Sequence, residues 1–262
     1  MMPSSTLPIS YLSEDWHIHS IASGHGTLDS VTDIAREAAK RGMKLIGISD
    51  HGPATLGGTA LSYFRNLPLC EPRRFGVEIR YGAEANILNG NGTLDIPDEI
   101  LEKLDYCIVS MHHPIYKGSA GASEFGVATQ GAYIRSTYPA NTVGTSSENT
   151  SAYIQAMSHP KVKILGHCDD GRFPVDYDEL VKAAAVIGVT PELNNVSLSP
   201  DSYRLDCRAN ATRLLEACAK YNCPILLSSD SHGRKHIGEV AYAMELIKEI
   251  GFPLTLIKNL PT

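Results

Sequence analysis

Seven short apolar runs, most of them ending in polar residues, recur along the 262-residue chain and alternate with segments of helical periodicity. Strands that alternate with helices imply a mostly parallel sheet with crossover helices. In a chain of this length they favour a single α/β domain over residues 1–262, either a barrel or a doubly wound sheet. The predicted strands cover residues 15–20, 44–50, 77–86, 105–112, 162–167, 188–194 and 224–230.

Helical periodicity is clear in three of the intervals between the strands. In residues 29–42 the apolar side chains from Val31 to Ala39 recur at helical spacing, and Gly42 follows as a stop signal. Residues 176–188 and 209–222 show the same pattern. The interval 114–147 is rich in Gly, Ser and Thr and has little periodicity. A stretch of this kind is typical of a functional loop or a disordered segment, and we expect it near the site.

Composition narrows the function classes. The net charge of −6 argues against non-specific nucleic-acid binding, which needs a basic face. No apolar run approaches the roughly 18 residues of a membrane span, and the N-terminal residues do not resemble a signal peptide. We therefore expect a cytoplasmic protein with no nucleic-acid or membrane partner. The six cysteines form no C-x-x-C pair, which favours free, buried thiols, Cys168 included.

Side chains that can bind metal follow the predicted strands at their carboxyl ends. In parallel α/β folds this edge carries the active site, because the loops that lead into the helices gather there. Residues i and i+2 of a strand share a face, so His17 can act together with His19, and Asp230 with His232. A chance distribution would scatter histidines over the surface, yet seven of the ten fall at this edge. The candidate ligands are His17, His19, His25, His51, Glu84, His112, His167, Asp230 and His232.

Nine ligands are too many for one ion. At roughly four protein ligands per zinc-like site, they suit two or three divalent ions with positions left for water and substrate. Imidazole and carboxylate ligands without thiolate suit zinc, manganese or iron. Clusters of such ions activate water and bind the oxygens of a phosphoryl group, so phosphoester hydrolysis is the expected reaction class.

The motifs around these residues resemble those of the PHP family, named for polymerase and histidinol phosphatase. The matching segments, in order along the chain, are HIHS (17–20), SDHG (49–52), GAEAN (82–86), SMH (110–112), GH (166–167) and DSH (230–232). The segments DHGP, GAEANILN and PELNN are similar to those of stand-alone bacterial phosphatases with a trinuclear zinc site. This resemblance implies a distorted (β/α)7 barrel and a phosphatase that acts on a small-molecule phosphomonoester.

The resemblance also implies a role for each ligand. Glu84 would bridge two ions, and a hydroxide between them would attack phosphorus. Glu84, Asp230 and His232 would be the catalytic residues. Zinc would be the first choice of metal, with manganese or iron as alternatives. The first ion would be held by His17, His19, Glu84 and Asp230, the second by Glu84, His112 and His167, and the third by His25, His51 and His232.

One departure from the family lies at the mouth of the site. The family usually has Pro-Gly after the fifth motif, whereas this chain has Cys168-Asp169-Asp170-Gly171. Asp169, Asp170 or a metal-bound water could protonate the leaving group. Loop cations could bind a phosphate or carboxylate of the substrate; the candidates are Lys117, Arg135, Arg172 and Arg234.

Three other interpretations remain open at this point. A histidinol-phosphate phosphatase of the same family would have a closely similar ligand set. A DNA-associated PHP nuclease or scaffold module is opposed by the lack of a basic stripe and of an aromatic stacking run. A metal-storage or structural protein would not need a long loop near its metals. The helical face at 239–249 fits a core or a subunit contact equally, so no oligomeric state is predicted.

Overall fold

The computed structural model describes residues 11–116 and 143–260. Its nine strands form one sheet, in the order β8-β7-β6-β5-β4-β2-β1-β9, with β3 paired antiparallel to β4 at the side. All other neighbouring strands are parallel. The strands are β1 (Glu14–His19), β2 (Leu45–Ile48), β3 (Arg73–Arg74), β4 (Val77–Asn86), β5 (Tyr106–Ser110), β6 (Val162–Leu165), β7 (Thr190–Asn194), β8 (Leu226–Ser228) and β9 (Ser231–His232).

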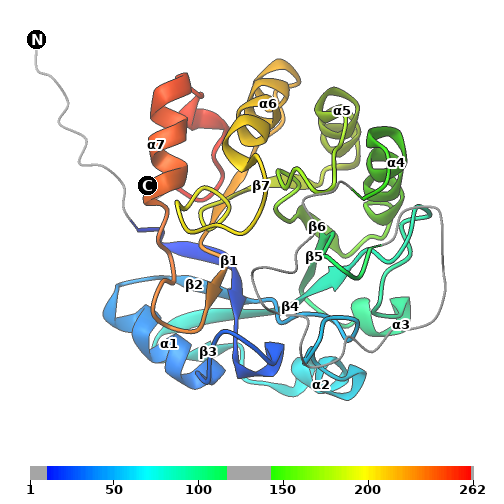
Figure 1. The fold of residues 1–262 in the computed structure, drawn as a ribbon. Helices are drawn as coiled ribbons and strands as arrows, with labels where there is room; N and C mark the ends of the chain where they lie inside the picture. The colour runs from blue at the N-terminus through cyan, green and yellow to red at the C-terminus, as the bar shows by residue number, and fades with distance from the viewer. Residues whose placement is uncertain (1–10, 117–142, 261–262) are drawn as a thin grey trace, which may run out of the picture.

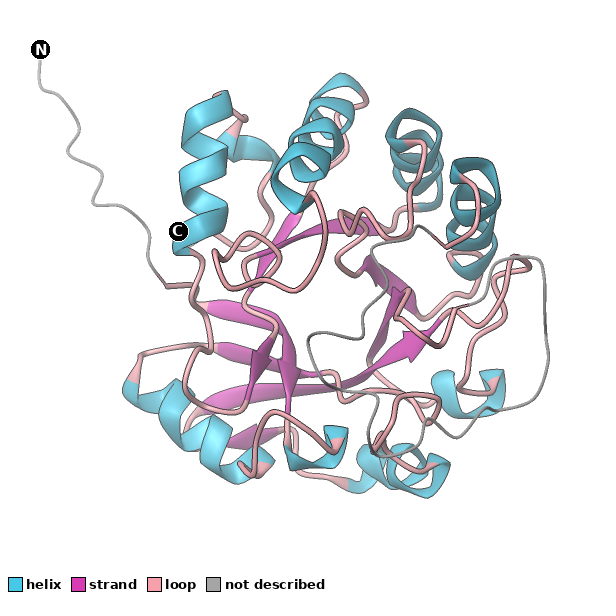
Figure 2. Ribbon diagram, in the orientation of Figure 1, coloured by secondary structure: helices cyan, strands magenta, loops and turns pink. Residues whose placement is uncertain are grey.

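The sheet curls into a barrel with helices outside it (Figures 1 and 2). Strands β8 and β9, at the two ends of the strand order, are separated in sequence only by Ser229 and Asp230. They are therefore two parts of one strand, interrupted where Asp230 takes a positive φ of 49°. The buried carboxylate of Asp15 accepts hydrogen bonds from the Ser229 backbone and hydroxyl, which ties β1 to this interruption. Seven strand positions close the barrel, which confirms the predicted distorted (β/α)7 fold.

The strands are apolar because both faces of the sheet are covered. Every residue of β2, β5 and β7 is buried, as expected for parallel strands packed between helices and a filled interior. One large cluster of apolar side chains runs through the molecule and includes residues of strands and of surrounding helices alike. A rigid frame of this kind holds the carboxyl ends of the strands in fixed relative positions.

The helices begin and end at recognisable signals. Ser30 and Asp33 form a capping box at the start of α1, and Asp176 caps α5, which ends at Gly188 with a φ of 86°. No helix of the described residues is long and apolar enough to cross a membrane. The helices are α1 (Val31–Lys40), α2 (Leu61–Asn66), α3 (Asp98–Leu101), α4 (Ser146–Ala156), α5 (Tyr177–Ile187), α6 (Cys207–Lys220) and α7 (Ala241–Ile250).

Helix α4 was not predicted, and it begins inside the interval 114–147 that we expected to be a loop. Its buried face includes the polar residues Asn149 and Thr150, so it lacks the apolar periodicity that marks a helix. Asn149 donates to the carbonyls of Val143 and Pro174, and the Thr150 hydroxyl accepts from the Asp176 backbone. The polar face thus anchors the segments around it. Most of the rest of the interval lies outside the described residues.

Candidate metal centre

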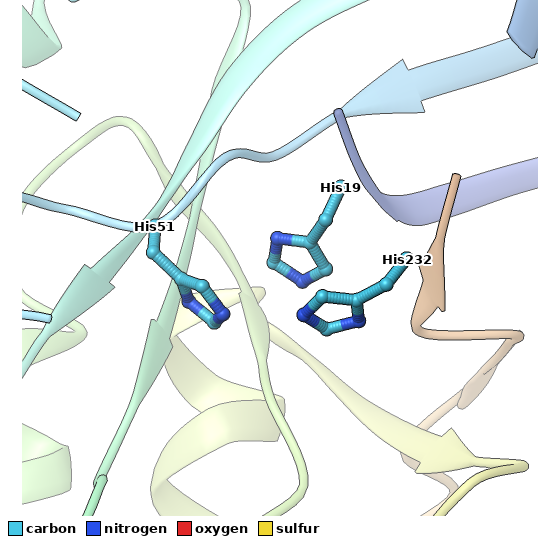
Figure 3. Close-up of side chains that lie close together, drawn as sticks. All are labelled: His19, His51 and His232. Carbon is cyan, nitrogen blue, oxygen red and sulfur yellow. The ribbon is translucent and has the colours of Figure 1, made fainter. Parts of the chain in front are cut away.

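The candidate ligands come from six positions around one end of the barrel. His17 and His19 lie in β1, Glu84 lies in β4 and His232 in β9. His25 lies in the loop after β1, while the others follow the strands β2, β5, β6 and β8. Neighbouring strands place them side by side. His19 and His232 are register partners across β1 and β9, and His51 forms a parallel bridge with Glu84. Figure 3 shows His19 and His232, from the neighbouring strands β1 and β9, converging with His51 from the loop after β2.

The deepest group consists of His17, His19 and Asp230. The Nε2 atoms of His17 and His19 lie 3.1 Å apart, and Asp230 Oδ1 lies 3.6 and 3.3 Å from them. All three side chains are buried. Together they offer three ligand atoms around one point at the closed end of the site.

Glu84 lies at the centre of the cluster and is fully buried. Its Oε2 is 2.6 Å from Nδ1 of His51, while its Oε1 is 2.9 Å from Nε2 of His167 and 3.4 Å from Nε2 of His112. Burial alone would raise the pKa of Glu84, but the imidazoles of His112, His17 and His51 bring it well below its usual range. The carboxylate therefore stays charged and lies close to the histidines of more than one group, as a carboxylate shared between two ions must.

The outer group consists of His19, His51 and His232, with His25 beside them. Nε2 of His25 lies 3.1 Å from Nε2 of His232, and the rings of His25 and His51 stack with their centroids 4.9 Å apart. Burial, and then the neighbouring imidazole of His51, lowers the pKa of His25 to about 4. Neutral imidazoles of this kind are available as metal ligands at neutral pH.

Hydrogen bonds turn the same nitrogen of several histidines toward the cluster. The Nδ1 atoms of His17, His25 and His112 donate to acceptor oxygens, those of Glu192, Ser23 and Asn86 respectively. Nδ1 of His19 donates to the Ser23 hydroxyl, since that hydroxyl itself donates to Asp50. The remaining nitrogen, Nε2, then carries a lone pair. In the pairs His17–His19 and His25–His232 these nitrogens face each other at 3.1 Å.

These contacts fit divalent metal ions. Two nitrogen lone pairs 3.1 Å apart repel each other unless a cation lies between them. Two ligand atoms that are each about 2.1 Å from a zinc ion are roughly 3.4 Å apart in tetrahedral geometry, which is close to the observed separation. His51 Nδ1 and Glu84 Oε2 are buried and lie 2.6 Å apart, but their alignment does not make a hydrogen bond, and neither atom has one to any other described residue. Burial opposes protonation of His17, yet Glu192, Asp230 and Glu84 raise its pKa well above the usual value. The donor set of the cluster therefore fits divalent metal ions.

A hollow opens over the outer ligands. Besides candidate ligands, its lining contains Thr55, His113, Ile115, Arg172, Tyr203 and Arg204. Of the four cations predicted from the sequence, Arg172 lines it. Arg234 does not; its half-exposed side chain pairs with Asp29 at 3.6 Å. Lys117 and Arg135 lie outside the described residues.

Arg204 was missed by the sequence analysis. Its buried guanidinium donates to Asp230 Oδ2 at 2.9 Å. The guanidiniums of Arg204 and Arg172 both lie near the ring of Tyr203, 5.5 and 5.3 Å from its centroid. Arg204 lies in a loop without periodicity, so no strand or helix pattern marked it. Adjacency to Tyr203, an aromatic ring in a polar loop, was the only signal in the sequence.

The two aspartates of the unusual segment do not line the hollow. Asp169 accepts from the Ser197 hydroxyl, and burial raises its pKa to about 7. Asp170 is held by the guanidinium of Arg172. Both positions argue against either carboxylate as the proton donor to a leaving group. Cys168 is buried, as predicted for a structural thiol.

Residues 15–190 match the family described as PHP domain. A probable phosphatase of Clostridium acetobutylicum is 33% identical over 245 residues, which cover 94% of this chain and 89% of that protein. A probable phosphatase of Thermoanaerobacter sp. is likewise 33% identical over 245 residues, with the same two coverages.

Solved structures share the fold. The histidinol phosphate phosphatase of Lactococcus lactis, complexed with zinc, L-histidinol and phosphate, has a TM-score of 0.58 at 20% identity and covers 92% of this chain and 94% of that one. The putative histidinol phosphatase of Listeria monocytogenes has a TM-score of 0.51 at 17% identity, covering 86% and 97%. The expected enzyme class, a hydrolase of the phosphatase type, is confirmed. The chain belongs to the PHP family.

Proposed function

We propose that the protein hydrolyses phosphomonoesters of small molecules with three bound divalent ions, zinc first among them. The observation that supports this best is the convergence of seven imidazoles and two carboxylates beneath a hollow that two arginines line. Three groups of three ligand atoms, each within 4.8 Å of one another, support a centre with several ions, and the groups share His19 and His51.

The ligand sets follow from the contacts. His17, His19 and Asp230 would hold the deepest ion. Glu84 would also reach this ion, because its Oε1 lies 3.5 Å from Nε2 of His17 and its Oε2 lies 3.6 Å from Nε2 of His19. His112 and His167 would share Glu84 with the second ion. The third ion would be held by His25, His51 and His232. When bound, such ions lower the pKa of water and neutralise phosphoryl oxygens.

The protein's own residues would orient the substrate. Arg204 holds Asp230 on one side and faces the hollow on the other, so it can bind a phosphoryl oxygen without leaving its carboxylate partner. Arg172 also lies beside the ring of Tyr203 and is fixed by Asp170. Two guanidiniums fixed in this way favour a phosphate group, whose oxygens accept their hydrogen bonds. His113 and Ile115 line the rest of the hollow and would contact the leaving group.

Histidinol phosphate is one substrate to test, because a solved structure of the same fold contains L-histidinol and phosphate. The relatives at 33% identity are named only as probable phosphatases. A panel of phosphomonoesters should therefore contain histidinol phosphate, sugar phosphates and p-nitrophenyl phosphate. A single-stranded DNA substrate tests the nuclease alternative.

The test begins with elemental analysis of protein purified without chelator. Turnover of the panel is then measured after metal removal and after reloading with zinc, manganese or iron. We expect close to three ions per chain and metal-dependent release of inorganic phosphate from at least one monoester. One ion or none, with no activity after reloading, would overturn the proposal. Cleavage of DNA without monoester turnover would favour the nuclease.

A further inference from the structure

Glu192 is a buried carboxylate that the proposed ligand sets do not use. It lies in the middle of β7 and is 1% exposed. Burying a charge is costly unless several partners compensate for it, so its partners indicate what it does. These partners belong to β1, β6, β7 and β8 or to the residues directly after them.

Both oxygens of Glu192 are occupied. Oε1 accepts from Nδ1 of His17 at 2.6 Å and from the hydroxyl of Ser228. Oε2 accepts from the backbone N–H of His167 at 2.8 Å and from the side-chain amide of Asn194 at 3.3 Å. With every contact directed at a donor, the carboxylate acts as an acceptor for other groups rather than as a ligand itself.

The contact with His17 decides which nitrogen faces the ions. A carboxylate only accepts, so Nδ1 of His17 must carry a proton, and in the neutral imidazole Nε2 is left with its lone pair. That Nε2 lies 3.1 Å from Nε2 of His19 and 3.6 Å from Asp230 Oδ1. A carboxylate behind a ligating imidazole also increases the basicity of the nitrogen that binds metal.

The contact with His167 supports an unusual backbone. His167 has a φ of 26°, a positive value that residues other than glycine seldom adopt. Its N–H points at Glu192 Oε2, and its Nε2 reaches Glu84 Oε1 at 2.9 Å. The hydrogen bond therefore holds the turn after β6 in the conformation that directs the imidazole to the bridging carboxylate.

We propose that Glu192 is a positioning residue that sets the geometry and the affinity of the two inner ion positions at once, through the ring of His17 and the backbone of His167. This inference rests on the proposed metal site. It assigns a role to the glutamate of the PELNN segment, which the ligand sets leave without one.

Glu192→Gln tests the inference with little change in volume. The amide offers one acceptor oxygen in place of two, and its NH2 group must face either the donors on the His17 side or those on the His167 side. We expect the affinity for the inner ions to fall about 10- to 100-fold, the usual cost of losing such a partner. Competition with a chromophoric chelator measures the affinity. The absorption spectrum of the cobalt-substituted protein should also change, because it reports ligand geometry.

Asn195→Ala is the matched control. Asn195 is a buried polar residue three positions along the chain, and its Oδ1 accepts from the backbone of Tyr242 and Ala243 at the start of α7. The Asn195→Ala substitution should lower the melting temperature of the metal-free protein without changing the cobalt spectrum or the affinity measured by chelator competition.

The outcomes separate this inference from the proposed function. A wild-type protein with tight metal binding and a Glu192→Gln variant with the same affinity and cobalt spectrum would overturn the inference alone. A wild-type protein that binds no metal would overturn both. Should Glu192→Gln fail to fold, Ser228→Ala and Asn194→Ala remove one partner of each oxygen, and an unchanged cobalt spectrum in both variants would contradict the inference.

Discussion

The inner and outer parts of the metal centre are built differently. The inner ligands His17, His19 and Glu84 are wholly buried in strands. Of the outer ligands, His25 is exposed and lies in a loop, while His232 is about a quarter exposed. The inner histidines are also braced by buried side chains, Glu192 behind His17 and Ser23 with Asp50 behind His19. His25 and His232 instead donate to backbone carbonyls, one of them at 3.4 Å.

This difference indicates separate tasks. In the proposed centre, rigid, buried ligands would hold their ions tightly, whereas ligands at the hollow would hold an ion in contact with solvent and substrate. The inner part should therefore determine whether the enzyme works at all. The outer part should determine how readily one ion exchanges.

Glu84→Gln should have the largest effect, because Glu84 reaches the ligands of both inner positions. The substitution keeps the shape of the side chain and removes its charge. We expect turnover to fall more than about 100-fold, which exceeds the usual loss when a residue that hydrogen-bonds to a metal ligand is removed. We also expect the variant to lose bound ions. Steady-state kinetics and elemental analysis measure both effects.

Glu99→Gln is the control for that substitution, since Glu99 is 73% exposed and its contact with Arg65 is a surface pair. It should leave turnover and metal content unchanged. Full activity in Glu84→Gln would show that the inner carboxylate is not needed for the reaction.

Metal removal should distinguish the two parts next. Stepwise addition of chelator should release the outer ion first, because His25 and His232 are reached from the hollow. The His25→Ala variant should contain one ion fewer before chelator is added, and it should then release its remaining ions at the same chelator concentrations as the wild-type protein. Elemental analysis after each step gives the comparison. Release of all ions in one step, with no effect of His25→Ala, would contradict a separate outer position.

The inner ligands were also easier to predict than the side chains around them. His17 and His19 have the i, i+2 spacing of one strand face, and Glu84 ends an apolar run, so periodicity alone places them at one edge. Glu192 and Arg204 act through contacts between distant segments, with His17 and Asp230. Local patterns contain no information on such contacts. For the same reason the seven strand positions of the barrel were predicted, whereas the two-residue strand β3 and helix α4, whose buried face is polar, were not.

Asp95 allows a test of how the inner part is braced. It accepts from the backbone and side-chain amides of Asn86, and Asn86 in turn accepts from Nδ1 of His112 at 2.7 Å. Burial raises the pKa of Asp95 to about 6 from 3.8. The folded chain thus keeps a proton that the unfolded chain releases between these values, so its stability falls as the pH rises through that window.

The matching variant is Asp95→Asn, which cannot titrate. The free energy of unfolding of the wild type, minus that of the variant, should decrease by about 2 kcal/mol between pH 4 and pH 7. Denaturant unfolding of metal-free protein at several pH values measures the difference, and the site histidines cancel because both proteins contain them. A difference that stays constant, or that grows with pH, would show that Asp95 is already ionised in the folded protein at pH 4.

Gly26→Ala should have the smallest effect and should be confined to the outer part. Gly26 has a φ of 76°, and a Cβ there would lie 2.6 Å from Cδ2 of His232. Gly42→Ala is the control, because Gly42 has a φ of 71° and no atom within 4 Å of the added carbon. Both variants should lose about 1–2 kcal/mol of stability from the left-handed backbone. Only Gly26→Ala should displace the His232 ring and weaken binding of the outer ion, while the inner ions stay bound. Equal metal affinity in the two variants would mean that His232 does not hold an ion, and the outer position would then have to be built from His25 and His51 alone.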